Sequence, residues 1–297
     1  MRPGSAILVS FGAAGDPVLL PGGEGTTWRA GDIVLKPVGD LRMARWTAEV
    51  YRILGDRSGA GFRVPEPVRA VSAGGDGDWV AQEPDGRAWA AWRWLPGAAA
   101  DWSGRSPYWP RLLAASQAFH AALAGLPAPD WLGTDGSPWT VADQVAWGER
   151  DPRDILRSAP AGLAGQVRQL LDALRPVGLP VQLVHGDLTG NVLFAGSGPP
   201  AVIDFSPYRR PAGLAVAVAA VDALTWHGAD PAILDELAGV PEAGQLLARA
   251  HVGRLVTELI SRGPRGGTAG GTAGDPAGLA TVERTARPVT SLLLGIQ

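Results

Sequence analysis

The sequence predicts an α+β protein in two parts, a β-rich part of about residues 1–97 and a mainly helical part of residues 98–297. Short apolar runs of strand length, separated by Gly, Pro and Asp turn signals, dominate the first part. Longer segments with apolar residues at helical spacing dominate the second. A chain of 297 residues with 46% hydrophobic residues can bury a core in each part.

Turn signals divide the first part into short elements. In order, these are an apolar run at 6–11, a loop at 22–27, a strand at 32–37, a helix at 41–54 and strands at 78–82 and 87–94. The loop contains Gly23, Gly25 and Thr26. The strand carries Lys36, and the helix carries Glu49 thirteen residues later.

The second part is helical except for one β segment. Helices are expected at 108–126, 143–156, 161–174, 215–226, 231–261 and 279–294. The β segment comprises strands at 180–184, 192–194 and 201–205. Residues 263–278 have low complexity and favour a loop.

Two residue types occur once each. Lys36 is the single lysine among 26 basic residues, and Asn191 is the single asparagine. Arginine fills every other basic position, so a retained lysine suggests a need for a compact ammonium group rather than a planar guanidinium.

Composition restricts the classes of partner. The net charge of −3 gives no overall basic field for nucleic acid or an anionic membrane. With no cysteine, the chain has neither disulfides nor thiolate metal sites, which fits a reducing compartment. The N-terminus is a poor signal peptide, and no apolar stretch is long enough for a membrane span. We therefore expect a cytoplasmic protein, and its oligomeric state stays open.

The segment 184–205, VHGDLTGNVLFAGSGPPAVIDF, carries the chemistry. Phosphoryl transfer needs one carboxylate to orient the attacking hydroxyl, and oxygen ligands to hold Mg²⁺. Asp187 suits the first task, and Asn191 and Asp204 suit the second. The competing interpretation is that Asp187 and Asn191 only shape a turn.

These residues resemble the aminoglycoside phosphotransferase and choline-kinase-like branch of the protein kinase superfamily. That family carries His-Gly-Asp, then Asn, then an apolar strand ending in Ile-Asp-Phe. The resemblance implies a two-lobe kinase-like fold, with a small antiparallel β-rich N-terminal lobe (1–97) that binds the nucleotide. A helical C-terminal lobe (98–297) would hold the catalytic loop and the acceptor site.

The resemblance also implies roles for particular residues. Lys36 would position the phosphates of ATP with Glu49 as its ion-pair partner, although lysine at a strand end is also commonly a surface residue. Residues 92–97 resemble the hinge strand that meets adenine, which places Trp94 beside the base. Backbone N–H groups around Gly23, Gly25 and Thr26 would cradle phosphates.

The chain departs from the family pattern in three places. Asn191 follows Asp187 by four residues, one fewer than usual, and Gly190 is available to absorb the difference. Ser206 replaces the glycine of Asp-Phe-Gly, and the loop at 22–27 lacks the spaced glycines of protein kinases. The expected function is an ATP- and Mg²⁺-dependent small-molecule kinase acting on a hydroxyl acceptor. The alternative is a weak or inactive kinase-like scaffold that binds nucleotide and acts through protein partners.

Other polar residues have structural interpretations. His185 is expected to hydrogen-bond backbone near the loop, and His120 to be a satisfied core histidine. The acidic residues between 143 and 154 favour a solvated helix face. Asp222 lies in an apolar helix and must be paired, by our hypothesis with the catalytic loop or with Arg209 and Arg210.

Overall fold

The computed structural model describes residues 2–21, 25–59, 61–72, 75–263 and 274–296. It has an α+β fold in which the contacts separate two compact units. The first unit contains residues 1–100 and 190–205, and the second contains residues 101–189 and 206–297. The sequence predicts a boundary at residue 97 and groups residues 190–205 with the helical part.

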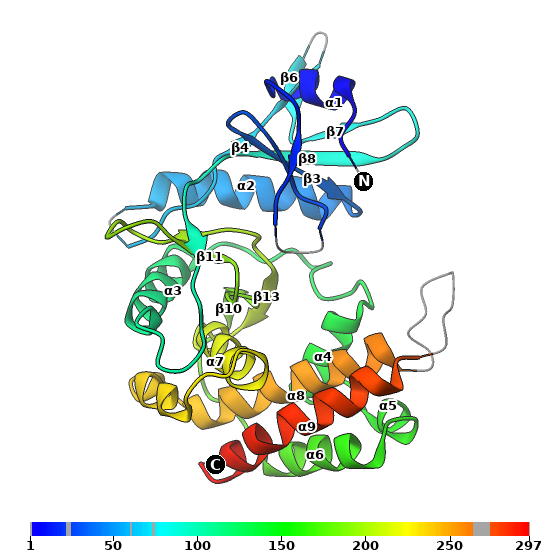
Figure 1. The fold of residues 1–297 in the computed structure, drawn as a ribbon, viewed down its shortest axis with the longest axis vertical. Coiled ribbons are helices and arrows are strands. Elements are labelled where there is room, and N and C mark those ends of the chain that lie inside the picture. Colours follow the sequence, from blue (N-terminus) through cyan, green and yellow to red (C-terminus); the bar gives the residue numbers. More distant parts are fainter. Residues whose placement is uncertain (1, 22–24, 60, 73–74, 264–273, 297) are drawn as a thin grey trace. The chain divides into compact units, whose positions relative to one another are not determined.

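An antiparallel sheet forms the centre of the first unit (Figure 1). Its strand order is β1-β2-β3-β8-β4, and β7 also pairs with β8. The bounds are β1 Val18–Leu19, β2 Trp28–Ala30, β3 Ile33–Val38, β4 Pro67–Val68, β7 Val80–Gln82 and β8 Ala88–Arg93. A separate hairpin joins β5 (Ala70–Ser72) to β6 (Gly75–Asp78). Ile33, Leu35 and Trp89 form the core under the sheet with residues of the first helix.

Two helices accompany this sheet. The apolar run at 6–11 forms a helix, α1 (Ser5–Ser10), although strands were expected to dominate here. A short apolar run has no periodicity that distinguishes a helix from a strand. The expected helix at 41–54 is confirmed as α2 (Leu41–Arg57), which packs against β4 and β7. Asp40 caps α2 by accepting the backbone N–H groups of Arg42 and Met43.

A three-stranded sheet explains why residues 190–205 group with the first unit. β11 (Val192–Phe194) lies between β12 (Ala201–Val202) and β9 (Ala98–Ala99). The backbone of Arg63 extends this sheet beside β12. Its N–H donates to the carbonyl of Pro200, and its carbonyl accepts the N–H of Val202. These backbone hydrogen bonds connect the chain on both sides of residue 200 to the β-rich unit.

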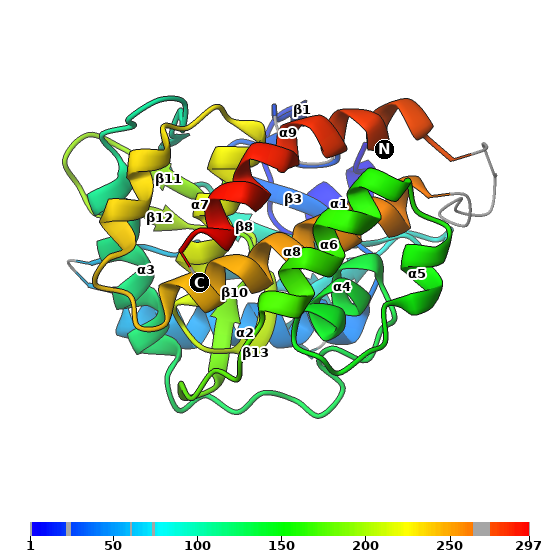
Figure 2. The same ribbon diagram turned by 90° about the horizontal axis from the view of Figure 1, so that it is seen from below.

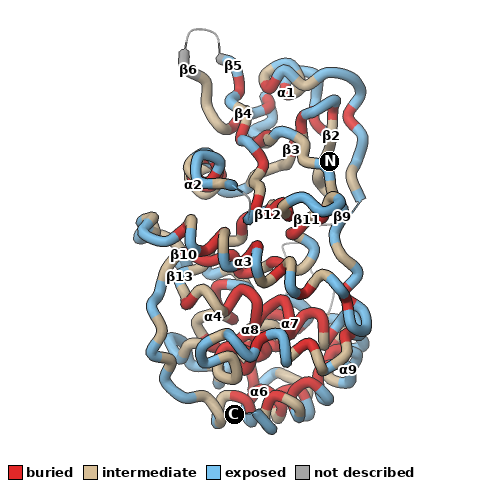
Figure 3. Tube along the Cα trace, turned by 90° about the vertical axis from the view of Figure 1, so that its left-hand side faces the viewer, coloured by how far each residue is buried: buried red, intermediate tan, exposed pale blue. Residues whose placement is uncertain are grey.

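The second unit is mainly helical. Its helices are α3 Trp109–Leu123, α4 Pro138–Ala146, α5 Arg153–Arg157, α6 Ala161–Ala173, α7 Leu214–Trp226, α8 Ala243–Arg262 and α9 Pro276–Leu294, with a 3₁₀ segment, η1, at Pro231–Leu237. α8 packs against α4, α6, α7 and α9, and α6, α8 and α9 run side by side (Figure 2). Burial is concentrated on α7 and α8 (Figure 3). α7 is apolar on almost every face, as expected for a core helix.

Details of the second part differ from the expected elements. The single helix expected at 143–156 is wrong, because α4 ends at Ala146 and α5 begins only at Arg153, after Gly148 and Pro152. The single helix expected at 231–261 is interrupted, because η1 ends at Leu237 and α8 begins only at Ala243. The intervening sequence contains Gly239 and Pro241, which disfavour a continuous helix. Most of the expected loop at 263–278 lies outside the described residues. Within the described part of the chain, no helix is both long and apolar enough to span a membrane.

Candidate active site

The first unit joins the single lysine to an aspartate of the motif. Lys36 lies in β3, and its Nζ is 2.7 Å from Oδ1 of Asp204. The two side chains are 30% and 39% exposed, so the pair is accessible to solvent. Since residues 36 and 204 are far apart in sequence, the fold itself brings these charges together.

Asn191 lies at the same end of the β11–β12 hairpin as Asp204. Val192 pairs with Val202, and the N–H of Ile203 donates to the carbonyl of Asn191 at 2.9 Å. Asn191 therefore precedes β11 where Asp204 follows β12. Gly190, immediately before Asn191, has a φ of +82°, which a side chain would strain. This glycine forms the turn in the shortened loop.

Tyr51 of α2 holds the chain next to Asp204. Its buried hydroxyl accepts the backbone N–H of Phe205 at 2.8 Å, and burial together with the charge of Asp204 raises the pKa of Tyr51. Trp46 also packs against the ring of Phe205. Asp204 has a φ of +52°, a left-handed conformation that is uncommon for a residue other than glycine. The contacts around Phe205 stabilise this conformation.

Glu49 does not pair with Lys36 in the structure. Its carboxylate accepts from Nε of Arg52 at 2.7 Å, and this contact lowers the pKa of Glu49. The buried face of α2 contains Thr47, Tyr51 and Leu54, and Glu49 projects from the opposite side of the helix. The expected Lys–Glu pair is therefore wrong, and Asp204 is the partner of Lys36.

The other expected nucleotide contacts lie in the first unit. Gly23 is outside the described residues, whereas Gly25 has a φ of +66° and Thr26 is half-buried just before β2. Trp94 follows β8, and its N–H donates to the carbonyl of Asp32 at 2.7 Å. The guanidinium of Arg29 lies 4.3 Å from the centre of its ring. The assignment of these residues to the nucleotide stays a prediction.

Asp187, in the second unit, belongs to a network of ion pairs. Nη2 of Arg254 is 2.8 Å from Oδ1 of Asp187. The same guanidinium binds both carboxylate oxygens of the buried Asp222, at 2.8 and 2.7 Å. Burial raises the pKa of Asp222, while the charge of Arg254 opposes that rise. Asp222 thus braces the loop at Asp187 through Arg254, the first of the two pairings expected for it. Arg210 pairs elsewhere.

Two buried histidines fix the backbone that leads to Asp187. Nδ1 of His120 lies 2.7 Å from the carbonyl of Ser116, and Nε2 accepts the N–H of His185 at 3.0 Å. Nδ1 of His185 accepts the N–H of Asp187 at 3.1 Å. These contacts assign the proton of His120 to Nδ1, and burial lowers its pKa to about 4. Both histidines are structural, as expected.

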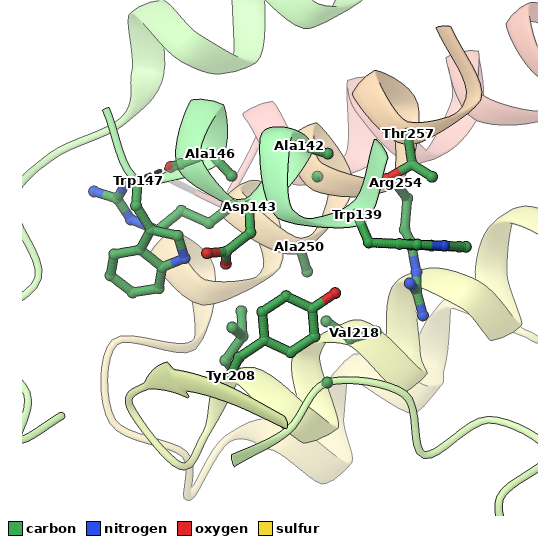
Figure 4. Close-up of a pocket in the computed structure, with 14 residues that line it drawn as sticks. Trp139, Ala142, Asp143, Ala146, Trp147, Tyr208, Val218, Ala250, Arg254 and Thr257 are labelled. Carbon is green, nitrogen blue, oxygen red and sulfur yellow. Dashed lines mark hydrogen bonds between the residues drawn. The ribbon is translucent and has the colours of Figure 1, made fainter. Parts of the chain in front are cut away.

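A pocket adjoins this loop within the second unit (Figure 4). Its lining includes Gly186, Arg254, Trp139 and Tyr208, and its volume is about 40 Å³. Tyr208 lies on β13 (Pro207–Arg210) opposite Val184 of β10 (Gln182–His185). A Cβ atom at position 186 would clash with the Tyr208 ring, so the glycine of His-Gly-Asp permits this packing.

The acidic helix face is not uniformly solvated. Asp143 lines the pocket with only 17% of its side chain exposed, and burial raises its pKa. Arg210 binds Asp143 at 2.6 Å and Glu149 at 2.7 Å. The expectation of a solvated face is therefore wrong for Asp143. The expectation of solvation is correct for Asp151 and Asp154, whose side chains are largely exposed.

The structure thus groups the motif residues in two sets. Lys36, Asn191 and Asp204 meet in the first unit, and Asp187 lies in the second beside Arg254 and the pocket. Sequence reasoning missed Arg254. The available signal was Asp222, a carboxylate in an apolar helix that requires a cation, although nothing in the sequence specifies which arginine supplies it.

Comparison with known proteins identifies the family. A model described as the phosphotransferase enzyme family (APH) matches residues 26–209, which include Lys36, Asp187, Asn191 and Asp204. The chain belongs to this family. It is a phosphotransferase, so the expected phosphotransferase family and the α+β fold are confirmed. Among curated proteins, none matches the sequence.

Solved structures support the fold of this phosphotransferase. A thermostable mutant of aminoglycoside phosphotransferase APH(4)-Ia in its apo form is 17% identical, with a TM-score of 0.60 over 97% of this chain and 98% of the other. An aminoglycoside phosphotransferase from Alicyclobacillus acidocaldarius is 14% identical, with a TM-score of 0.59 over 100% and 94%. Amicoumacin kinase hAmiN, in complex with AMP-PNP, Ca²⁺ and Ami, is 14% identical, with a TM-score of 0.60 over 93% and 88%.

Proposed function

We propose that this phosphotransferase transfers the γ-phosphoryl group of ATP to a hydroxyl group of a small molecule, with Mg²⁺ as cofactor. The observation that carries the proposal is the contact of 2.7 Å between Lys36 and Asp204. It joins the one lysine of the chain to the aspartate of the Ile-Asp-Phe motif. A phosphate-binding cation and a metal-binding carboxylate are the two charges that a kinase nucleotide site needs.

Nucleotide use is supported by the relatives. Structures of APH(4)-Ia contain AMP-PNP or ADP, and that of APH(9)-Ia contains ADP and spectinomycin. In this chain Lys36, on β3, is the residue that would bind the α- and β-phosphate oxygens. Its ammonium group now neutralises Asp204, so we expect nucleotide binding to exchange that carboxylate for phosphate oxygens.

The residues present fit Mg²⁺. Asp204 offers carboxylate oxygens and Asn191 an amide oxygen at one end of the same hairpin, and hard oxygen ligands are the type that Mg²⁺ prefers. Within the described residues, no group of three acidic or histidine side chains could form a metal site by itself. Two protein ligands suit a metal that also binds substrate phosphates. When bound, Mg²⁺ supplies charge neutralisation for the phosphates.

Asp187 is the proposed base. The acceptor oxygen attacks the γ-phosphorus, the bond from phosphorus to the β,γ-bridging oxygen breaks, and ADP leaves with that electron pair. The hydroxyl proton passes to the carboxylate of Asp187. Arg254 and the N–H···His185 contact hold Asp187 in a single orientation. Catalysis then depends on positioning and charge rather than on a covalent intermediate.

Acceptor-dependent formation of ADP tests the proposal. The wild type is compared with Asp187→Asn, a variant that keeps the side-chain shape and loses the base. We expect kcat to fall by roughly 10²–10⁴-fold while AMP-PNP binding is unchanged. If the wild type binds nucleotide and forms no ADP with any alcohol, a nucleotide-binding scaffold describes the protein better.

A further inference from the structure

Charges around the pocket of the second unit are already paired. Arg210 binds Asp143 and Glu149, and its own side chain is only 14% exposed. Arg254 binds Asp187 and Asp222 in the same way. A cationic ligand would have to compete with an arginine for these carboxylates, of which Asp143 and Asp222 are largely buried. Breaking a buried ion pair costs far more than a solvated pair gains.

The lining itself is more basic than acidic. Among the described residues that line the pocket, Asp143 is the single acid, whereas Arg249 and Arg254 are both basic. Arg249 donates to the backbone carbonyls of Ala146 and Arg175 rather than to a carboxylate. With the carboxylates of Glu149, Asp187 and Asp222 counted, the charges around the pocket are close to balanced, and a ligand with several ammonium groups would meet carboxylates that arginines already bind.

Aromatic side chains provide the alternative contact surface. Trp139 lines the pocket and is 50% exposed, which is unusual for so large an apolar side chain. Trp147 and Tyr208 line it as well, together with alanine, leucine and valine side chains. The guanidinium of Arg254 lies 5.3 Å from the centre of the Trp139 ring, and the exposed part of the indole beside the hollow offers a stacking surface for a flat ring.

The Tyr208 hydroxyl adds a polar contact. Burial raises the pKa of Tyr208 to about 12, helped by the nearby charges of Asp143, Asp187 and Asp135 and opposed by Arg254. The hydroxyl stays protonated at neutral pH and can donate a hydrogen bond. Figure 4 shows it directed toward Trp139. The pocket volume of about 40 Å³ is a few times the space that one water needs, so a single narrow group fits in the pocket.

We infer that the acceptor is an uncharged alcohol bearing an aromatic ring, such as an aryl glycoside, and not a polycationic aminoglycoside. Its ring lies against Trp139, and a polar atom accepts the hydrogen bond from Tyr208. The inference rests on the proposed function, because it assigns the pocket beside Asp187 to the acceptor.

Calorimetric binding tests the inference without requiring turnover. Phenyl glucoside and hygromycin B serve as probes, each titrated in the presence of AMP-PNP and Mg²⁺. We expect the wild type to bind phenyl glucoside more tightly than hygromycin B. Trp139→Ala should weaken phenyl glucoside binding by about tenfold, as expected for a lost stacking contact, and leave AMP-PNP binding unchanged. Tyr208→Phe should weaken it by about fivefold.

A matched control is Trp226→Ala, which removes a tryptophan that is 39% exposed on α7 and does not line the pocket. It should bind phenyl glucoside as the wild type does. Tighter binding of hygromycin B, or phenyl glucoside affinity that is equal in Trp139→Ala and the wild type, would overturn the inference. So would undetectable binding of phenyl glucoside at millimolar concentration. Failure of the proposed function has other signs, which are the absence of AMP-PNP binding or, where nucleotide binds, the absence of ADP formation with any alcohol.

Discussion

Lys36 is the residue whose type the proposed chemistry restricts most. Its ammonium is within 2.7 Å of Asp204, in a sequence that uses arginine for all other basic positions. A guanidinium is planar and larger, so it keeps the charge and loses the fit to phosphate oxygens. We expect Lys36→Arg to raise the KM for ATP by about tenfold or more, with unfolding free energy in the absence of nucleotide changed by less than about 0.5 kcal/mol.

The control for Lys36→Arg is Arg45→Lys, which alters an exposed ion pair with Asp78 in the same unit. Arg45→Lys should change neither the KM for ATP nor the unfolding free energy appreciably, because exposed ion pairs contribute little to stability. An unchanged KM for ATP in Lys36→Arg would remove Lys36 from the nucleotide site. Steady-state kinetics and urea unfolding give the two readouts.

The hydroxyl oxygen of Tyr51 is the atom that holds the backbone next to Asp204. Tyr51→Phe removes the hydroxyl that accepts the N–H of Phe205 and leaves that buried donor unpaired. The expected cost is about 1–3 kcal/mol of unfolding free energy. Because Asp204 precedes Phe205, the variant should also lose part of the stabilisation that Mg²⁺ adds to AMP-PNP. Tyr108→Phe, in the second unit, is the control. Equal Mg²⁺ effects in Tyr51→Phe and the wild type would contradict this account.

At the scale of elements, α7 and α8 are joined by the Asp222–Arg254 pair. Asp222→Ala leaves a buried guanidinium with one carboxylate fewer, and we expect a loss of about 3–5 kcal/mol. The double variant Asp222→Leu with Arg254→Met should recover most of this stability, because apolar groups replace both charges. Its kcat should stay low, because Asp187 loses its partner. Recovery of full activity would show that Arg254 does not position Asp187. Urea unfolding and kinetics on each variant provide the data.

The elements also show where sequence patterns suffice. Turn residues and apolar spacing located β3, β8, α2 and α7 within a few residues. Motif spacing identified Asp187 and Asp204 as candidate site residues, and their roles stay predictions. The patterns failed where the outcome depends on packing. Residues 6–11 were too short to show a period, and Glu49 faces away from the buried side of α2. Arg254 pairs with residues 32 and 67 positions away, and local sequence carries no record of such contacts.

At the scale of the whole molecule, stability should depend on pH through two buried histidines. Burial lowers the pKa of both His120 and His251 to about 4, from 6.5 for an exposed histidine. Below pH 6.5 the unfolded chain binds protons that the folded chain does not. The folded state is therefore destabilised as pH falls from 6.5 to 4, by about 1.4 kcal/mol per pH unit for each histidine.

His251→Gln isolates one of these contributions. His251 contacts Thr290 of α9 and is remote in sequence from the catalytic motif. The difference in unfolding free energy between the variant and the wild type should change by about 1.4 kcal/mol per pH unit over this window. Carboxylates such as Asp143 and Asp222, whose pKa values are raised, act in the opposite direction and cancel in the difference. Parallel pH profiles would show that His251 is not buried in its neutral form.

Thermal unfolding tests most directly whether Asp204 and Lys36 form the proposed metal-dependent nucleotide site. Wild type and Asp204→Ala are heated with ATP, with Mg²⁺, and with both. At about a hundred times its dissociation constant, a ligand adds about 2.7 kcal/mol to native stability. We predict that the wild type gains its full shift in midpoint only with both ligands, and that Asp204→Ala loses the Mg²⁺-dependent part. Equal shifts in both proteins would contradict the proposed site, and so would no shift at millimolar nucleotide.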